Sequence, residues 1–440
     1  MKLGCIILAT FIGCFILSSC QPTPQQSSAA GITPVSSDPT NGRTNYVLEQ
    51  DLNDGIKLKI DASVETTSEL PYAEFVKRDF SSEEIEKIFY ALCGEGQIFQ
   101  CADTKAELER QVLQLKSQLA QIENENNLLI QGLNLEIERL TESISSAPYT
   151  KPAGSLDKIL TYPDGVIEVG DSAGPNALFQ VCQDQDSIKK FISYTSQEQN
   201  RFFLRVDNTA PALEISQSEA VDYAMSFLSE IGLNEDFSLA KCGVQYLGQS
   251  FPSLDMGAIE SAYYDIVFLR RVNGASQSYS IQVKNGYTSP YQAPFYHEYI
   301  EFNVNDNGIQ SFFWEEPGDL YNMKSTASVL SLENAISIFH ENAMQIYNKY
   351  YFDSRDKFDP QYIVVNIHRI RLGIASIMAD PRTAYITPVW EFFGYIQYSP
   401  PGEDPTFYNY TSFSKNCEMD DVLCSINATN GDIIDRNGEW

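Results

Sequence analysis

The sequence contains little histidine: only His297, His340 and His368 occur in 440 residues. Histidine is the side chain used most often as a general base and as a metal ligand, so most histidine-based catalysis has little material here. His297 begins a segment that differs from the zinc motif HExxH only at Glu301. Its apolar–polar alternation predicts a strand, and a strand holds these two residues too far apart to share one ion. We therefore expect no metal and no other cofactor.

Catalytic fingerprints are also absent. No GxSxG elbow, phosphate-binding loop or glycine-rich dinucleotide fingerprint occurs. Ser-x-x-Lys spacings at 155–158, 187–190 and 412–415 lack the partner motifs of penicillin-recognising enzymes. The sequence therefore offers no catalytic residue and predicts a protein that is not an enzyme. A hydrolase with an unrecognised site is one alternative.

Basic residues are scarce: 30 Lys and Arg stand against 59 Asp and Glu, which gives a net charge of −29. Nucleic-acid binding requires a basic surface, so we expect no nucleic-acid partner. Anionic lipid headgroups would also repel the body of the protein, which favours a spacer between body and membrane.

Long apolar runs are absent after Leu17. The preceding run is too short to span a bilayer comfortably, and Leu17-Ser18-Ser19-Cys20 at its end resembles a bacterial lipobox. The resemblance implies a signal peptide over 1–19, cleavage before Cys20, and acylation of its thiol by palmitate-type chains. It also implies a lipid anchor on the extracytoplasmic face of the cell membrane. Residues 20–45 are rich in Gln, Pro, Ser and Thr and predict a disordered tether with a reach of about 25–30 Å.

Nine cysteines occur in the chain. Besides the signal-peptide residues and Cys20, six remain, and an even number outside the cytoplasm favours disulfides. The candidates are the local pairs Cys93–Cys101 and Cys417–Cys424, with Cys182 and Cys242 left over. These spacings do not match zinc knuckles, which argues against a metal site. Free buried thiols are the alternative to disulfides.

Residues 46–103 are predicted to form a small N-terminal α+β region. Ile56 to Ala62 alternate apolar and polar residues, as in a half-buried strand. Ser81 and Glu84 form a capping-box pattern for a helix that Gly94 ends.

Residues 104–145 are the most periodic segment. Leu and Ile recur at intervals of four and three from Leu108 to Ile144, which is typical of an amphipathic helix. Asn126 lies on the same stripe, where a polar residue sets register in paired helices. We predict one long helix packed on its own domain in a monomer. A coiled-coil dimer and a helical hairpin broken near Gly132 are alternatives.

Residues 146–211 are predicted to be a β-rich connection, with strands at 165–169 and 201–206. An internal repeat follows, because helices open at Ser216 and at Ser331 and each is followed by alternating segments. These segments are 263–269, 278–283 and 299–304 in the first copy, and 362–367, 385–393 and 422–426 in the second. Each copy ends in an Asn-Gly turn, at 307–308 or 430–431. We predict two α+β modules, 212–325 and 326–440, each a helix on a mainly antiparallel sheet.

Two resemblances support this α+β organisation. The lipobox, the tether, "IDASVE" at 60–65, "FSSEEIEKIFYALCG" at 80–94 and "TKAELERQV" at 104–112 resemble uncharacterised lipoproteins of clostridial-type bacteria. "TPVWEFFG" at 387–394 and "INATNGDII" at 426–434 resemble tandem PepSY-like or cystatin-like modules of exported regulatory proteins. The first resemblance implies export and lipidation and supplies no catalytic residue.

Aromatic side chains are the candidate ligand-binding residues: Tyr291, Tyr296, Trp314 and Trp390. Core packing is the usual role of such residues. We expect a lipid-anchored, non-enzymatic protein that binds or regulates a partner protein or envelope component. A substrate-binding lipoprotein for a sugar or peptide is the main alternative.

Overall fold

Two sheets organise the described part of the chain. The computed structural model describes residues 45–53, 55–67, 70–120, 127–161, 164–171, 174–183, 189–196, 213–248, 259–277, 297–325, 328–358, 362–399, 406–407 and 421–434. The predicted signal peptide, the tether and Cys20 lie outside these ranges. Within them, no helix has the length and apolar character needed to cross a membrane.

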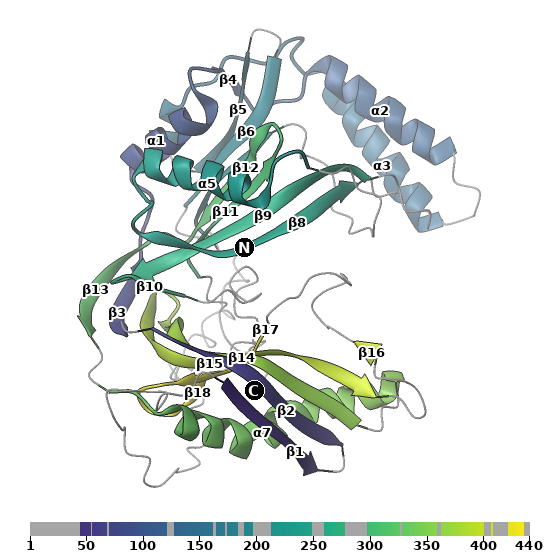
Figure 1. Cartoon of the computed structure of the whole chain (residues 1–440). Helices are drawn as coiled ribbons and strands as arrows, with labels where there is room; N and C mark the ends of the chain where they lie inside the picture. Colours follow the sequence, from purple (N-terminus) through teal and green to yellow (C-terminus); the bar gives the residue numbers. More distant parts are fainter. Residues whose placement is uncertain are drawn as a thin grey trace, which may run out of the picture.

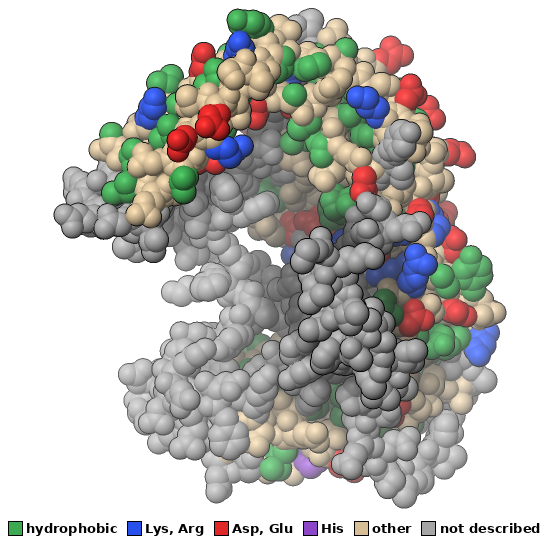
Figure 2. All heavy atoms as spheres, turned by 180° about the vertical axis from the view of Figure 1, so that it is seen from behind, with side chains coloured by type: hydrophobic (Ala, Val, Ile, Leu, Met, Phe, Trp, Pro, Cys, Tyr) green, Lys and Arg blue, Asp and Glu red, His purple; other side chains and the backbone are tan. Residues whose placement is uncertain are grey.

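Each sheet belongs to one of two lobes, drawn one above the other in Figure 1 and seen from behind in Figure 2. The lower-lobe sheet consists of β1 (Asn45–Asn53), β2 (Ile56–Thr66), β3 (Pro71–Lys77), β13 (Gly318–Ser325), β14 (Tyr362–Asp380), β15 (Thr383–Ser399), β16 (Thr406–Phe407), β17 (Asp421–Asn427) and β18 (Ile433–Ile434). The upper-lobe sheet consists of β4 (Gln97–Gln100), β5 (Asp164–Asp171), β6 (Gly174–Cys182), β7 (Phe191–Ser196), β8 (Phe237–Gly248), β9 (Ile259–Val272), β10 (Ala275–Ser276), β11 (Tyr299–Asn305) and β12 (Gly308–Glu315). Mixed helices and sheets confirm the predicted α+β class.

The upper sheet is built from two similar halves. Apart from β10, its strands run in the order β4-β5-β6-β7-β12-β11-β9-β8, and the last strands of the two halves, β7 and β12, pair antiparallel. One helix precedes each half: α1 (Ser82–Cys93) and α5 (Gln217–Ile231). The order is therefore palindromic, as two related units placed about an approximate twofold axis would give.

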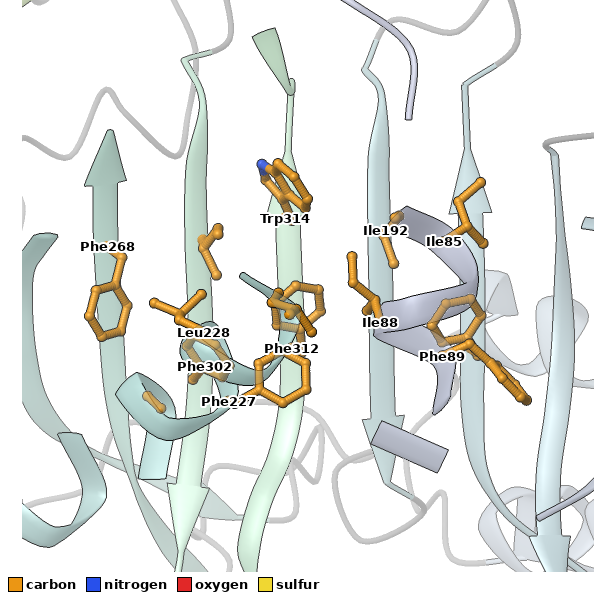
Figure 3. Close-up of a cluster of buried hydrophobic side chains, with 14 of the residues drawn as sticks. Ile85, Ile88, Phe89, Ile192, Phe227, Leu228, Phe268, Phe302, Phe312 and Trp314 are labelled. Carbon is orange, nitrogen blue, oxygen red and sulfur yellow. The ribbon is translucent and has the colours of Figure 1, made fainter. Parts of the chain in front are cut away.

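Helices α1 and α5 pack on the same face of the upper sheet. Phe89 of α1 and Phe227 of α5 meet the sheet residues Phe179, Phe302 and Phe312 in one apolar core (Figure 3). The next residues along each strand point to the opposite face, because side chains alternate along a strand. In the described part of the chain, no helix lies on that opposite face.

Capping boxes begin both helices. The Ser81 hydroxyl accepts from the Glu84 amide while the Glu84 carboxylate accepts from the Ser81 amide, and Ser216 and Glu219 repeat this exchange. Gly232 ends α5 in the left-handed conformation, with φ of 81°. The predicted start of α1 and the predicted helix at Ser216 are confirmed.

The lower sheet joins distant parts of the chain. β2 pairs in parallel with β14, and α7 (Leu332–Phe358) covers the face formed by Ile56, Leu58 and Ile363. Phe339 of α7 stacks on Phe392 of β15, with ring centroids 4.5 Å apart. The region predicted at 46–103 is thus divided: β1 to β3 belong to the lower lobe, whereas α1 and β4 belong to the upper lobe.

The predicted single helix over 104–145 is wrong. Two helices, α2 (Lys105–Ala120) and α3 (Asn127–Ile144), pack on each other beside the upper lobe (Figure 1). Leu108 and Leu140 share one small core, whereas one straight helix would hold them about 48 Å apart. The alternative of a helical hairpin is supported by this packing. Gly132, where the break was expected, lies inside α3. Asn126 lies outside the described residues.

Within the described residues, helix-plus-strand units occur three times rather than twice. α5 is followed by β8-β9-β11-β12 and α7 by β14-β15-β17-β18, each a meander of neighbouring strands. α1 is followed in the same way by β4-β5-β6-β7. The sequence pattern missed this unit because α2, α3 and α4 (Asp157–Thr161) are inserted between β4 and β5. The strands predicted at 201–206 and 278–283 lie outside the described residues.

Candidate functional site

The lobes meet where β3 leads into α1 and where β12 leads into β13. The Lys77 amide donates to the Arg382 carbonyl at 2.9 Å, and the Arg78 amide donates to the Pro317 carbonyl at 2.8 Å. Arg371 of β14 reaches the upper lobe, where its Nη2 donates to the Ser276 carbonyl at 2.9 Å. We call this region the junction.

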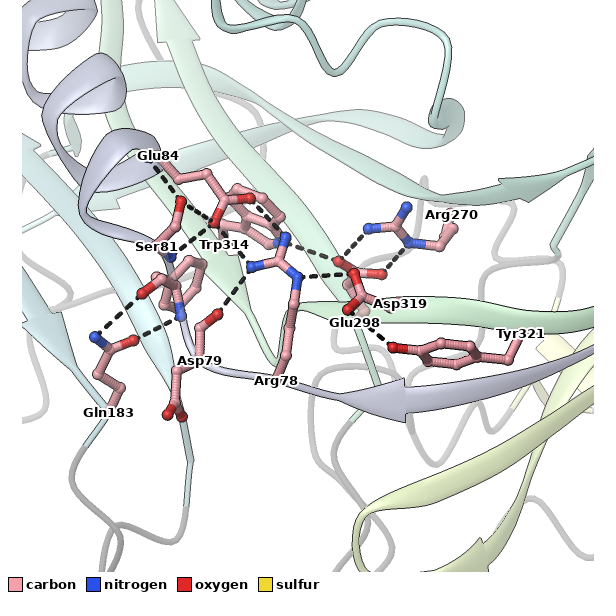
Figure 4. A network of polar contacts seen from close by, with 11 residues as sticks. Arg78, Asp79, Ser81, Glu84, Gln183, Arg270, Glu298, Trp314, Asp319 and Tyr321 are labelled. Atoms are coloured by element: carbon pink, nitrogen blue, oxygen red, sulfur yellow. Dashed lines mark hydrogen bonds and ion pairs between the residues drawn. The ribbon is translucent and has the colours of Figure 1, made fainter.

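Arg78 is the centre of the junction (Figure 4). Its Nη1 and Nη2 donate to both Glu84 carboxylate oxygens at 2.8 and 2.6 Å, and its Nε donates to Asp319 Oδ1 at 3.1 Å. Burial alone would raise the pKa of Glu84, but the bonds from Arg78 and Ser81 outweigh it and hold that pKa below its usual value. Arg78 therefore ties the first turn of α1 to the start of β13.

A second guanidinium–carboxylate pair lies beside it. Arg270 and Glu298 are 8% and 6% exposed and form a two-point contact, with Arg270 Nη2 and Glu298 Oε1 at 2.7 Å. Trp314 Nε1 donates to the same oxygen at 3.1 Å. Burial opposes the charge on Arg270, but Glu298 outweighs it and raises the pKa of Arg270. Arg270 and Trp314 thus both donate hydrogen bonds to Glu298 inside the protein.

Two buried carboxylates, Glu315 and Glu316, lie at the C-terminal end of β12. Lys77 Nζ lies 3.1 Å from Glu316 Oε2, and Lys189 Nζ lies 2.8 Å from Glu315 Oε1. Burial lowers the pKa of Lys77 against the attraction of Glu316, and burial raises the pKa of Glu315 against the attraction of Lys189. The Lys190 amide donates to Glu316 Oε1 at 3.0 Å. These pairs tie β12 to the start of β7 and to β3.

A small recess opens at the junction. It is lined by Phe75, Arg270, Gln277, His297, Glu298 and Ser376, and it has room for about one water molecule. Ser376 Oγ and Gln277 Oε1 are 3.0 Å apart across the lobes. In the described part of the chain, no group of three or more His, Cys, Asp or Glu side chains is arranged to hold a metal ion.

The helix-free face of the upper sheet carries buried polar groups. Asp265 is fully buried and accepts from Lys241 Nζ at 2.8 Å and from Gln245 Nε2 at 2.7 Å. Asn303 neighbours Asp265 on β11, and its buried Oδ1 has no hydrogen-bond partner among the described residues. Unpaired buried acceptors are uncommon, so this oxygen is open to a donor.

The helix-free face of the lower sheet is also charged. Glu391 is fully buried in β15 opposite Arg371 of β14. The Arg369 guanidinium lies 3.8 Å from the centre of the Phe393 ring and 3.5 Å from Glu65. Arginine over an aromatic face is attracted by the ring electrons.

The predicted aromatic ligand residues are not brought together. Trp314 and Trp390 are both fully buried, one in the core of each lobe. Trp390 Nε1 donates to the Leu330 carbonyl at 2.9 Å. Both indoles therefore serve as core side chains in the structure. Tyr291 and Tyr296 lie outside the described residues.

The predicted disulfides are not formed among the described cysteines. Cys93, Cys101, Cys242 and Cys424 are free thiols, and Cys182 Sγ donates to the Lys189 carbonyl at 3.6 Å. Cys93 ends α1 and Cys101 follows β4, so a four-residue strand of about 13 Å separates them. Cys182 and Cys242 lie on β6 and β8, five strand spacings or roughly 24 Å apart, whereas a disulfide needs Cα atoms about 4–7 Å apart. Cys417 lies outside the described residues.

Sequence reasoning missed the junction. Its residues, Arg78, Arg270, Glu298 and Asp319, are far apart in the chain and form no motif. One signal was available, since Asp265 and Arg270 interrupt the apolar strand "YYDIVFLRRV" at 263–272. A charge inside such a strand indicates a buried partner.

Together, the fold and the junction define a two-lobed α+β protein whose lobes are joined by buried ion pairs. No family model and no curated protein matches the sequence. Among solved structures, an uncharacterized protein from Eubacterium rectale is 13% identical with a TM-score of 0.45, and the match covers 90% of this chain and 95% of that protein. The Bacillus megaterium YpeB C-terminal domain is 13% identical with a TM-score of 0.24, over 62% of this chain and 89% of that domain. With both scores below 0.5, neither match carries the PepSY-like resemblance further.

Proposed function

We propose that the chain is a lipid-anchored, non-enzymatic protein of the extracytoplasmic membrane face, which binds a partner protein or envelope component between its lobes. The placement of the helix-free faces carries this proposal. In Figure 1, α7 lies below the lower sheet while α1 and α5 lie above the strands β8 and β9, so sheet faces without helices border the space between the lobes. Sheet faces in folded domains are usually covered by another layer. Asp265 and Glu391 on these faces are already buried within the chain, so a partner would bind at the partly exposed positions of the faces, such as Lys241 and Arg369.

The chemistry of these faces supports a polar partner. Lys241 and Asp265 lie on the upper face, and Arg369, Arg371 and Glu391 lie on the lower face. Charges of both signs on these faces favour a partner whose own charges are complementary to them. The open acceptor at Asn303 adds a hydrogen-bonding position.

The junction supports a preformed site. The ion pairs of Arg78 and Lys77 hold the lobes in one relative orientation. A surface that is already ordered loses less entropy when it binds. The expected anchor at Cys20 and the tether over 20–45 would place this surface away from the headgroups.

Site-specific photocrosslinking in cells tests the proposal. A photoreactive amino acid replaces Thr195 on the upper helix-free face or Lys59 on the lower one. Matched positions on the helix side are Tyr223 of α5 and Glu341 of α7, both exposed. We expect a discrete adduct from Thr195 and Lys59 and none from the helix-side positions. Equal adducts from all four positions, or none from Thr195 and Lys59, would overturn the proposal.

A further inference from the structure

Three tyrosines gather at the edge of the lower sheet, on β3, β13 and β15. Tyr72 and Tyr385 stack with ring centroids 5.8 Å apart and an angle of 24° between the rings. Tyr321 and Tyr385 both lie opposite Glu74, one on each side of it. Tyr321 is 50% exposed and Tyr385 is 41% exposed. We call Tyr72, Glu74, Tyr321 and Tyr385, together with Asn322, the tyrosine ledge.

The strand pattern directs these rings outward. Ala73 and Phe75 of β3 and Ile386 of β15 point into an apolar core. Tyr72, Glu74 and Tyr385 alternate with these residues and therefore point to the other face. In the described part of the chain, β13 pairs with β3 alone, so the ledge is open on that side. The core does not need these tyrosines, which sets them apart from the buried aromatics.

Polar groups surround the rings. Asn322 Nδ2 donates to Glu74 Oε2 at 2.7 Å, and Lys324 Nζ lies 4.5 Å from the centre of the Tyr72 ring. Asn322 has a left-handed backbone, with φ of 53°, within a bulge between Tyr321 and Lys324. Bulges re-aim side chains at sheet edges and near binding sites. Burial, Tyr385 and Glu74 raise the pKa of Tyr72, so its hydroxyl stays protonated and can donate.

We infer that the tyrosine ledge binds a neutral β-linked oligosaccharide. A sugar ring has an apolar face of C–H groups and a rim of hydroxyls. An exposed tyrosine provides a flat apolar surface with a polar tip, and the hydroxyl rim needs donors and acceptors of the kind that Glu74, Asn322 and Lys324 supply. The ledge combines both within a few residues.

The size of the patch also favours a small ligand. The exposed large apolar side chains of the ledge are Tyr321 and Tyr385, and Met323 beside them is 53% exposed. Aromatic side chains have about 150–250 Å² each, so half-exposed rings present roughly 100 Å² apiece. A stable protein interface needs about 800 Å² on each side. The apolar part of the ledge therefore falls short of a protein interface and is close to the area of a few sugar rings.

The spacing fits an extended chain of sugars. Tyr321 and Tyr385 lie on strands separated by β3, so their backbones are about 10 Å apart. Sugars in an extended β-linked chain turn over at each link, so alternate rings present the same face. One ring can therefore stack on Tyr385 and the next but one on Tyr321, while Glu74 contacts the ring between them.

Titration of the purified full-length protein in detergent tests this inference, with chitohexaose and cellohexaose as probes and saturation-transfer NMR and calorimetry as readouts. We expect one of them to bind with a dissociation constant in the millimolar range or tighter. Tyr385→Ala and Tyr321→Ala should each weaken that binding about tenfold, which corresponds to roughly 1.4 kcal/mol. Tyr385→Phe, which keeps the ring, should stay within about threefold of the unchanged protein.

Tyr223→Ala is the matched control, because Tyr223 is an equally exposed tyrosine on α5 of the other lobe. It should leave binding unchanged, and melting curves should show that every variant folds. Absence of binding to both probes would overturn the inference. So would binding that survives both Tyr385→Ala and Tyr321→Ala, or a ledge that binds a protein and no saccharide. None of these results bears on the crosslinks expected between the lobes.

Discussion

Removal of the Glu298 carboxylate should destabilise the upper lobe by about 3–5 kcal/mol, the cost of breaking a buried ion pair from one side. Arg270 is 8% exposed and would lose both of its contacts to the carboxylate. Trp314 Nε1 would lose its acceptor as well. Glu298→Ala should therefore leave a buried cation and a buried donor without partners.

Two tryptophans make this effect measurable in each lobe separately. The chain has three: Trp314 in the upper core, Trp390 in the lower core, and Trp440. With Trp390 and Trp440 changed to Phe, fluorescence reports on the upper lobe, and with Trp314 and Trp440 changed it reports on the lower lobe. Urea unfolding in each background, with and without Glu298→Ala, compares the midpoints. We expect a large shift from the upper reporter and a smaller one from the lower reporter.

A compensated variant provides the control. Arg270→Met combined with Glu298→Leu removes both charges at once, and apolar replacement of a whole buried pair is often neutral or stabilising. The double variant removes the unpaired cation but still leaves Trp314 Nε1 without its acceptor, so it should recover part of the lost stability. A cost below about 1 kcal/mol for Glu298→Ala, or a double variant as unstable as the single one, would refute the role assigned to this pair.

Three further predictions concern the anchor, the thiols and the hairpin. Cys20→Ala should abolish labelling by a palmitate analogue in cells, and unchanged labelling would refute the lipobox interpretation. Burial raises the pKa of the Cys93 thiol from 9.0 to about 12. The stability that the buried, protonated Cys93 thiol contributes should therefore be complete below pH 9 and lost as the pH rises toward 12. In the native protein at pH 8, the exposed Cys101 should react with iodoacetamide well before Cys93. Mass spectrometry can measure both rates, and equal rates would contradict this prediction. Leu140→Ala should destabilise the α2–α3 hairpin by about 2–5 kcal/mol. Amide hydrogen exchange in α2 and α3 should become faster, by an amount that does not depend on protein concentration. The control Leu113→Ala, at an exposed position, should change the exchange little.

Local elements were predictable because their causes lie within a few residues. At the start of α1, the Ser81 and Glu84 side chains each accept a hydrogen bond from the other residue's backbone amide, so no distant residue is needed. The alternation from Ile56 to Ala62 likewise indicates which side chains of β2 are buried. The hairpin turn of Asp306 and Asn307 between β11 and β12 was predictable because glycine readily adopts the positive φ of 91° found at Gly308.

Pairings across the chain were not predictable in the same way. β2 lies beside β14, about three hundred residues later, and nothing in Ile56 to Thr66 names that partner. The same Leu and Ile stripe serves a long helix or a hairpin equally well, and the choice depends on whether Leu108 meets Leu140. Trp314 and Trp390 gave no sign in sequence of whether they face a ligand or a core.

The sequence by itself determined the starts of helices, the inward faces of strands and the excess of acidic residues, since each depends on neighbouring residues or on composition, and it predicts a lipid anchor at Cys20. Only the tertiary structure decided which strands share a sheet, that Arg78 and Arg270 meet their carboxylates at one junction, and that Tyr72, Tyr321 and Tyr385 form one ledge. The physical reason is that hydrogen bonds between strands are alike in every pairing. The partner is therefore selected by the packing and charge of side chains that become neighbours only once the chain has folded.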